Sequence, residues 1–225
     1  MSDPGVPDQE VCESWIDATF DLDSDYRAGP RPSEDHKLMH TSCKYPDGTG
    51  SIDSEWVEVD EDGNVVVDPA VLAQQAVDAL ALPAPRIDAS PPGAQLVNLP
   101  VWLWLEDDSW QEQTATASVP GTTVTAVAVP VLATWEMGDG ATETCYSAGT
   151  EWTESAEAED ASPDCGHTYT STSAGAPGGE YPVDVTVTWN ITWSGGGESG
   201  TEPDMTTAAA TSWPVAQSQA VGEAD

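Results

Sequence analysis

Hydrophobic and polar side chains alternate strictly along residues 181–193. The odd-numbered positions carry the large apolar residues, which are Tyr181, Val183, Val185, Val187, Trp189, Ile191 and Trp193. Proline, aspartate, threonine and asparagine occupy the positions between them. A period of two over this length predicts a β-strand with one face in the core and the other in water.

Shorter β-patterns precede and follow this segment. Residues 96–105 are apolar on both faces, which is typical of a strand covered on both sides. Residues 113–119, 122–129 and 131–136 have the residue types of further strands, interrupted by Pro120-Gly121 and by Pro130, and residues 205–221 contain a last one. Several short strands at such spacing predict a mainly β fold, arranged as a β-sandwich.

The pattern changes before residue 86. Residues 1–54 are rich in Asp, Pro and Gly and show little periodicity, whereas two short β runs around an Asp-Gly turn predict a hairpin over 55–67. Asp68-Pro69 is a typical helix start, and one helix is expected over 69–82. We therefore expect an N-terminal accessory region over 1–84, a β-sandwich over 85–216 and a flexible acidic tail over 217–225.

The charge of the chain is strongly one-sided. It has 40 acidic residues and 5 basic ones, which give a net charge of −35. Such a surface repels nucleic acid phosphates and anionic lipid head groups, because binding to either depends on Lys and Arg. No apolar run is long enough to cross a membrane. Direct nucleic acid binding and membrane insertion are therefore not expected, whereas basic partners, or solubility at high salt, fit the composition.

The four cysteines are well separated: Cys12, Cys43, Cys145 and Cys165. None has the C-x-x-C spacing of a metal site, so two disulfides are expected. Three connectivities exist, and proximity in sequence favours Cys12–Cys43 with Cys145–Cys165. Disulfides indicate an oxidising compartment. The first residues lack the basic start and apolar run of an export signal. Together with the disulfides, this leads us to expect a mature secreted or cell-envelope protein whose export signal has been removed.

Three short motifs resemble those of one known family, the PKD domain, which is an immunoglobulin-like β-sandwich. They are an aromatic-x-hydrophobic-GDG turn, a His-x-Tyr and a Gly-x-Tyr-x-Val, found here in that order over roughly residues 86–213. Their characteristic residues are Trp135, Gly138, Asp139, Gly140, His167, Tyr169 and Tyr181. The stretch LVNLPVWLWL (residues 96–105), together with the preceding helix, also resembles uncharacterised secreted actinobacterial proteins with a PKD-like domain, which implies an envelope or extracellular setting and no established activity.

These motif residues have a structural interpretation that does not depend on the family. Gly138 and Gly140 allow positive φ around Asp139, whose carboxylate can cap its own turn. Trp135 is expected to point into the core, and Tyr169 to donate a hydrogen bond as a tyrosine corner does. One departure from the family is the long segment 143–164, which the second disulfide is expected to close.

Catalytic and metal-binding signals are weak. The sequence has no G-x-S-x-G or P-loop motif, and no catalytic residue is assigned. His36 and His40 have the i, i+4 spacing that would present two imidazoles on a helix, although prolines lie just upstream. Asp21, Asp23 and Asp25 are spaced like the start of a calcium loop, but its glycine and its final glutamate are missing. Calcium is thus a minor hypothesis, and no other cofactor is expected.

The ten tryptophans raise a carbohydrate hypothesis, because sugar rings stack on exposed indoles. The candidates for such a platform are Trp102, Trp104 and Trp110. The main expectation is a non-catalytic secreted or cell-surface protein that acts as a protein-binding or spacer module. The alternatives are a polysaccharide-binding module, or an enzyme or enzyme subunit with a site between the N-terminal region and the sandwich.

Overall fold

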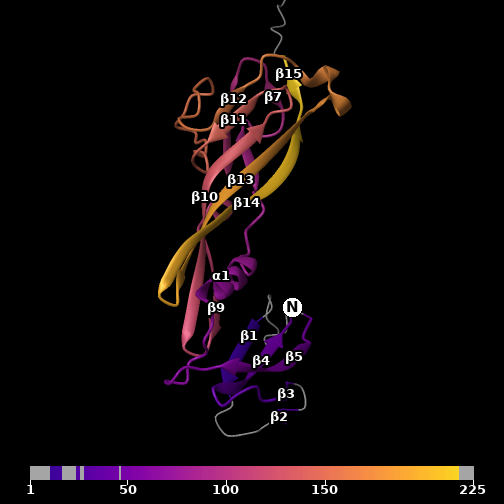
Figure 1. Cartoon of the computed structure of the whole chain (residues 1–225). Helices are drawn as coiled ribbons and strands as arrows, with labels where there is room; N and C mark the ends of the chain where they lie inside the picture. Colours follow the sequence, from indigo (N-terminus) through magenta and orange to yellow (C-terminus); the bar gives the residue numbers. More distant parts are fainter. Residues whose placement is uncertain (1–10, 17–23, 26–27, 46, 218–225) are drawn as a thin grey trace, which may run out of the picture. The chain divides into compact units, whose positions relative to one another are not determined.

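The structure of the chain is a computed structural model that describes residues 11–16, 24–25, 28–45 and 47–217 (Figure 1). It is mainly β with one α-helix and two disulfides, as predicted. The chain forms two compact units. Unit 1 contains the chain up to residue 79 together with 115–126 and 193–200, and unit 2 contains 80–114, 127–192 and the chain from 201 onward. The predicted division between residues 84 and 85 remains a prediction.

Unit 1 contains a three-stranded antiparallel sheet in the order β1-β4-β5. Its strands are β1 (Val11–Ile16), β4 (His36–Lys44) and β5 (Gly50–Glu58), and a separate short pair is formed by β2 (Ser24–Asp25) and β3 (Gly29–Pro30). Cys12 lies directly opposite Cys43 in the β1–β4 ladder, and the two form the first disulfide. The sequence did not predict this sheet, because its central strand carries His, Lys, Thr and Ser rather than an alternation of apolar residues.

A tight turn and the helix follow this sheet. The bridge between Val59 and Val65 closes the turn of the predicted hairpin. Within it the side-chain and backbone N–H groups of Asn64 donate to the Asp60 carboxylate, and these hydrogen bonds hold the pKa of Asp60 below its usual value. Helix α1 (Pro69–Asp78) begins at an Asp68 cap that accepts from the Ala70 N–H at 2.8 Å.

The helix ends at Asp78, earlier than the predicted residue 82. Leu82 precedes a proline, and such residues are sterically pushed out of the helical conformation. The buried face of α1 consists of Leu72, Ala73, Ala76 and Val77.

Unit 2 contains most of two further sheets, and residues 115–126 and 193–200 of the larger sheet belong to unit 1. The larger has the order β11-β10-β13-β14, with β9 also paired to β10, and the smaller has the order β12-β8-β6. The strands of the larger sheet are β9 (Gln113–Val119), β10 (Thr122–Glu136), β11 (Thr142–Cys145), β13 (Tyr181–Gly195) and β14 (Glu198–Trp213). Those of the smaller are β6 (Ile87–Ser90), β8 (Pro100–Leu105) and β12 (Gly166–Thr168).

Short elements complete unit 2. Strand β7 (Gln95–Leu96) pairs in parallel with β15 (Val215–Ala216). Three single-turn 3₁₀ helices are η1 (Asp107–Ser109), η2 (Ser173–Gly175) and η3 (Pro177–Gly179). In the part of the chain that the structure describes, no helix has the length and apolar character needed to cross a bilayer.

The core of unit 2 is the predicted face of β13. Val183, Val185, Val187, Trp189 and Ile191 are all fully buried, which confirms the period-two prediction for this strand. Burial of each such side chain contributes about 1.5–3 kcal/mol. The second disulfide adds a covalent link between the sheets, because Cys145 ends β11 in the larger sheet and Cys165 immediately precedes β12 in the smaller one.

Pro130 does not separate two strands as predicted, since β10 runs through it as one strand. The buried positions change parity at this point, however. Even-numbered residues from Val124 to Pro130 are buried, and odd-numbered ones are buried from Ala133 onward. A switch of parity beside a residue that lacks an N–H indicates a β-bulge, which lets the strand absorb the proline.

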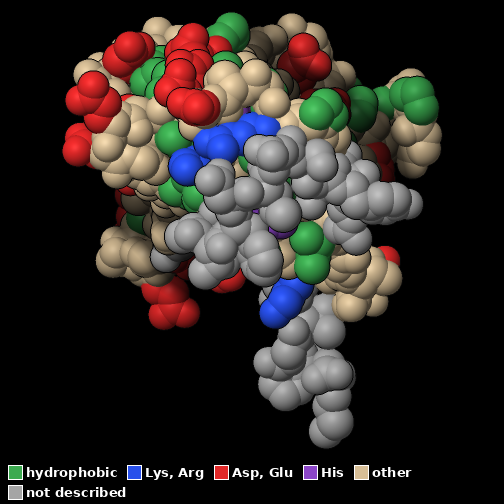
Figure 2. All heavy atoms as spheres, turned by 60° about the horizontal axis from the view of Figure 1, so that its bottom comes forward, with side chains coloured by type: hydrophobic (Ala, Val, Ile, Leu, Met, Phe, Trp, Pro, Cys, Tyr) green, Lys and Arg blue, Asp and Glu red, His purple; other side chains and the backbone are tan. Residues whose placement is uncertain are grey.

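Charged side chains cover the surface unevenly. Figure 2 shows Asp and Glu side chains at many points of the face it displays, and Lys and Arg at only a few separate places. Among the described residues the basic side chains before residue 45 are Arg31, Lys37 and Lys44, and after it Arg86 is the single basic residue in the sequence. The guanidinium of Arg86 is itself paired with the carboxylates of Glu106 and Asp108.

Removal of the second disulfide by Cys145→Ala with Cys165→Ala is expected to lower the free energy of unfolding by about 3 kcal/mol. The reason is that the bridge closes a segment with a sequence separation of 20, and opening it returns loop entropy to the unfolded chain. Denaturant unfolding followed by tryptophan fluorescence measures the change. The matched control is Cys12→Ala with Cys43→Ala, which should leave the hydrogen-exchange protection of β13 unchanged. Equal loss of β13 protection in both variants would contradict the assignment of the second disulfide to this core.

Candidate functional site beside the second disulfide

The GDG turn joins β10 to β11 and is held by its own aspartate. The Met137 N–H donates to the Ala141 carbonyl at 3.0 Å, and the Ala141 N–H donates to Asp139 Oδ1 at 2.9 Å. Gly138 has a φ of 75°, and a Cβ there would lie 2.3 Å from the Pro182 carbonyl oxygen. Glycine is required at this position both for its backbone conformation and for the close approach of the chain that enters β13.

His167 on β12 lies between two carboxylates. Its Nε2 is 3.0 Å from Asp139 Oδ2, and its Nδ1 is 2.9 Å from Glu143 Oε1. The exposed fraction of the side chain is 7% for His167, 15% for Asp139 and 36% for Glu143. Each ring nitrogen of His167 thus has a carboxylate oxygen of its own within hydrogen-bond distance. The cluster connects the GDG turn and β11 to the smaller sheet.

Two tyrosines pack beneath this histidine. The His167 ring meets the Tyr169 ring edge-on at 4.6 Å, and Tyr169 stacks on Tyr181 at 5.4 Å. The Tyr169 hydroxyl donates to the Met137 carbonyl and the Tyr181 hydroxyl to the Thr172 carbonyl, both at 3.1 Å. Burial, followed by the nearby Asp139 charge and Tyr181, raises the pKa of Tyr169 well above that of an ordinary tyrosine.

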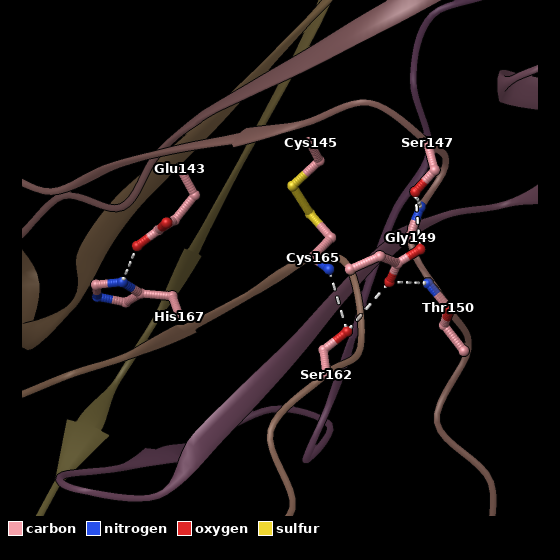
Figure 3. Close-up of a disulfide and its surroundings, with 9 residues drawn as sticks. Glu143, Cys145, Ser147, Gly149, Thr150, Ser162, Cys165 and His167 are labelled. Atoms are coloured by element: carbon pink, nitrogen blue, oxygen red, sulfur yellow. Dashed lines mark hydrogen bonds and ion pairs between the residues drawn. A yellow bond between two sulfur atoms is a disulfide. The ribbon is translucent and has the colours of Figure 1, made fainter.

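A shallow hollow opens next to His167. It has a volume of about 290 Å³, and the chain from Ala161 to Thr168 forms most of its lining. Pro100, Ala161 and Pro163 provide apolar atoms, and Glu143 and Asp164 provide carboxylates. Figure 3 shows the Cys145–Cys165 disulfide between the Glu143–His167 pair on one side and the Ser147, Thr150 and Ser162 network on the other.

Asp164 organises the long segment that follows β11. Its Oδ2 accepts from the Ser147 hydroxyl at 2.8 Å, and its Oδ1 accepts from the Thr150 N–H at 3.0 Å and from the Ser162 hydroxyl at 3.3 Å. Burial by itself would raise the pKa of Asp164, but these hydrogen bonds outweigh it and hold the pKa below its usual value. The carboxylate therefore stays ionised and brings the two ends of this segment together.

The same segment adds to the edge of β8. The Leu105 N–H donates to the Ala148 carbonyl at 2.7 Å, and the Leu103 N–H donates to the Cys165 carbonyl at 3.0 Å. Gly149 has a φ of 87°, and a Cβ there would lie 2.1 Å from the Leu103 carbonyl oxygen. The long segment predicted from 143–164 is therefore a built part of unit 2 rather than a loop that only connects two strands.

The sequence also offered histidine and aspartate candidates for a metal site. His36 and His40 lie on strand β4 and not on a helix, so residues at i and i+4 are roughly 13 Å apart along the strand. The helical spacing considered for a metal site was therefore wrong. Asp21 and Asp23 lie outside the described residues, as does the side chain of Asp25. Within the described ranges, no group of three or more His, Cys, Asp or Glu is arranged to hold a metal ion.

The tryptophan candidates differ from one another in exposure. Trp102 is only 8% exposed, and its indole N–H donates to the Asp160 carbonyl at 2.7 Å, so the long segment covers its ring. Trp104 and Trp110 are half-buried. The carbohydrate role of these residues and an enzyme site remain hypotheses.

Sequence reasoning missed two carboxylates of this region, Glu143 and Asp164. Each lies within two positions of a bridged cysteine, but so do Glu10 and Glu13, so this proximity does not separate them from the other acidic residues. No family model, curated protein or solved structure matches the chain. The resemblance to the PKD domain therefore stays a prediction from the sequence motifs.

Tyr169→Phe is expected to lower the free energy of unfolding by about 1–3 kcal/mol, because it leaves the buried Met137 carbonyl without its donor. Tyr181→Phe is the matched control. It also removes one hydroxyl bonded to a backbone carbonyl, but Tyr181 is half-buried and water can replace the lost donor. Denaturant unfolding of both variants gives the comparison, and an equal loss in the two would contradict a special role for Tyr169.

High pH should destabilise the wild type more than Tyr169→Phe. The folded protein raises the pKa of Tyr169, so the neutral phenol stabilises the fold fully below the ordinary tyrosine value of about 10. This contribution is lost as the pH rises through the higher folded value. Ultraviolet difference titration of the wild type against the variant should show a tyrosine that ionises above that ordinary value. A difference curve centred at or below it would refute the burial argument.

Proposed function

We propose that this protein is a non-catalytic, exported protein-binding module built on a PKD-like, immunoglobulin-like β-sandwich, and that its partner is basic. The fold part of the proposal is supported by the way in which the three motif pieces meet. Tyr169 of the His-x-Tyr donates to Met137 of the turn, and Tyr181 of the third piece stacks on Tyr169. Residues that define a family by sequence alone thus contact one another in one cluster.

Export is supported by the covalent structure. Both disulfides are formed, and no free cysteine is found among the described residues. Such bonds persist in oxidising compartments and are rare where thiols are kept reduced. Two disulfides are consistent with an extracellular location.

The observation that carries the binding proposal is the hollow beside the second disulfide. His167 contacts Oε1 of Glu143, and the second oxygen of this partly exposed carboxylate takes no part in that contact. The apolar atoms of the hollow suit the methylene stem of a lysine or arginine, and the carboxylate suits its charged end. The net charge of −35 would steer a basic partner toward the molecule and speed its association.

The polar groups of the motif itself support a structural role for that motif. Asp139 caps its turn and contacts His167, and both hydroxyls of the tyrosine pair donate to backbone carbonyls. Groups held in this way stabilise the walls of the hollow. Recognition would then fall to Glu143 and the surrounding acidic surface.

Glu143→Gln is expected to weaken binding of a Lys-containing peptide by about threefold to fivefold, which is the effect of losing one partly exposed ion pair. The probe is an unstructured peptide of Gly-Lys-Ser repeats, titrated calorimetrically at physiological salt. Glutamine keeps a side-chain contact to His167, so the fold should persist, as circular dichroism can verify.

The matched control is Glu112→Gln, which removes an exposed carboxylate outside the hollow. Equal weakening by both variants would mean that bulk charge alone attracts the peptide and that the hollow is not the site. Absence of any saturable binding would refute the proposal of a basic partner.

A further inference from the structure

Strand β14 ends the larger sheet. Within the part of the chain that the structure describes, the strand order stops at β14, whose one neighbour is β13 (Figure 1). Its even-numbered residues from Thr206 to Ser212 are exposed, and the odd-numbered ones from Met205 to Thr211 are only half-buried. The corresponding inward row of β13 is fully buried. Residues 205–212 are thus open to solvent on one face and partly open on the other.

The first part of β14 carries features that block strand pairing. Glu198, Glu202 and Asp204 supply charge, and Pro203 lacks an N–H. The less exposed positions also change from even to odd numbers between Glu202 and Met205, which indicates a β-bulge at Pro203-Asp204. Charges, proline and bulges are the means by which proteins prevent an edge from pairing with other chains.

None of these features continues into residues 205–212. This segment reads Met-Thr-Thr-Ala-Ala-Ala-Thr-Ser, without a charge or a proline, in a chain with 40 acidic residues. The Trp189 indole donates to the Thr207 hydroxyl at 3.0 Å, so this stretch is held in register on β13. An ordered strand at a sheet edge presents its outward N–H and C=O groups in a regular row, which is a template for another strand.

Carboxylates lie at both ends of this open stretch. Asp204 precedes it, and the Ser212 hydroxyl at its far end donates to the Glu180 carboxylate. An added strand with Lys or Arg at its two ends and uncharged residues between them would match this distribution. A second copy of the chain is a poor match, because two molecules of net charge −35 repel each other.

We infer that residues 205–212 of β14 are the docking edge for an extended, Lys- or Arg-flanked segment of the basic protein partner, which adds to the sheet as a further strand. This inference rests on the proposed function and places a second contact with the same partner at β14, the opposite end of the larger sheet from β11. Main-chain hydrogen bonds along the edge supply affinity, and the flanking carboxylates select a basic segment.

The test uses the unchanged protein and a synthetic peptide, Lys-Lys-Thr-Val-Thr-Val-Thr-Val-Lys-Lys. Two derivatives carry N-methyl groups on alternate central residues, in the odd or in the even set. Only one set of amide groups can face β14, so one derivative should bind at least about tenfold more weakly and the other should bind like the parent. Hydrogen exchange should show new protection within 205–212 when the parent binds.

Two results would overturn the inference while leaving the proposed function intact. One is equal affinity of the parent and both derivatives, which would indicate attraction by charge alone. The other is binding of the Gly-Lys-Ser peptide but not of the strand peptide. Failure of both peptides to bind would remove the proposed function as well. The oligomeric state of the protein alone is measured by sedimentation at high salt. A dimer whose 205–212 amides are protected from exchange would assign the edge to a second copy and would overturn the inference.

Discussion

The hydrogen bond from the Tyr169 hydroxyl to the Met137 carbonyl is the contact on which the arrangement of unit 2 depends. It connects the residue that follows β12 in the smaller sheet to the turn that ends β10 in the larger one. Both residues are fully buried, so neither group can turn to water instead. The Tyr169 ring also supports His167 on one side and Tyr181 on another. The end of one sheet, the start of β13 and the GDG turn are therefore positioned by a single side chain.

The second disulfide acts on the same pair of sheets by a different physical route. A covalent bond between Cys145 and Cys165 restricts the unfolded chain, whereas the tyrosine hydrogen bond selects one geometry in the folded chain. The two effects suit a protein with so much negative charge, because self-repulsion weakens the compact state. Opposing it is the burial of the valine and tryptophan row of β13.

The parts of the fold that were predictable from sequence are those in which one physical requirement acts alone. Burial of one face explains why the alternation in 181–193 located β13, and the start of α1 followed from the Asp68 cap and Pro69. Strand β4 was not predictable, because its buried apolar residues, Leu38 and Met39, are adjacent and the rest are mostly polar, which leaves no apolar period. The break predicted at Pro130 was wrong, because a β-bulge can accommodate a proline that a regular ladder cannot.

The candidate site was predictable only in part. His167, Asp139 and Tyr169 were recognisable from their motifs, whereas Glu143 and Asp164 were not. Forty carboxylates leave no compositional contrast that would single out two of them. Their roles depend on distances to His167 and to Ser147, which are set by the pairing of β11 with β10 and by the disulfide. Such distances between segments far apart in sequence are a property of the folded chain.

The long segment after β11 has one more consequence. Its two ends are fastened by the disulfide, by Asp164 and by the hydrogen bond from Trp102 to Asp160, whereas its middle, residues 151–158, consists mostly of exposed positions. Changes of length or sequence in that middle would leave the attachment points and the sheets untouched. The molecule thus contains a natural display position, where a foreign peptide could be carried on a rigid, disulfide-closed frame without redesign of the core.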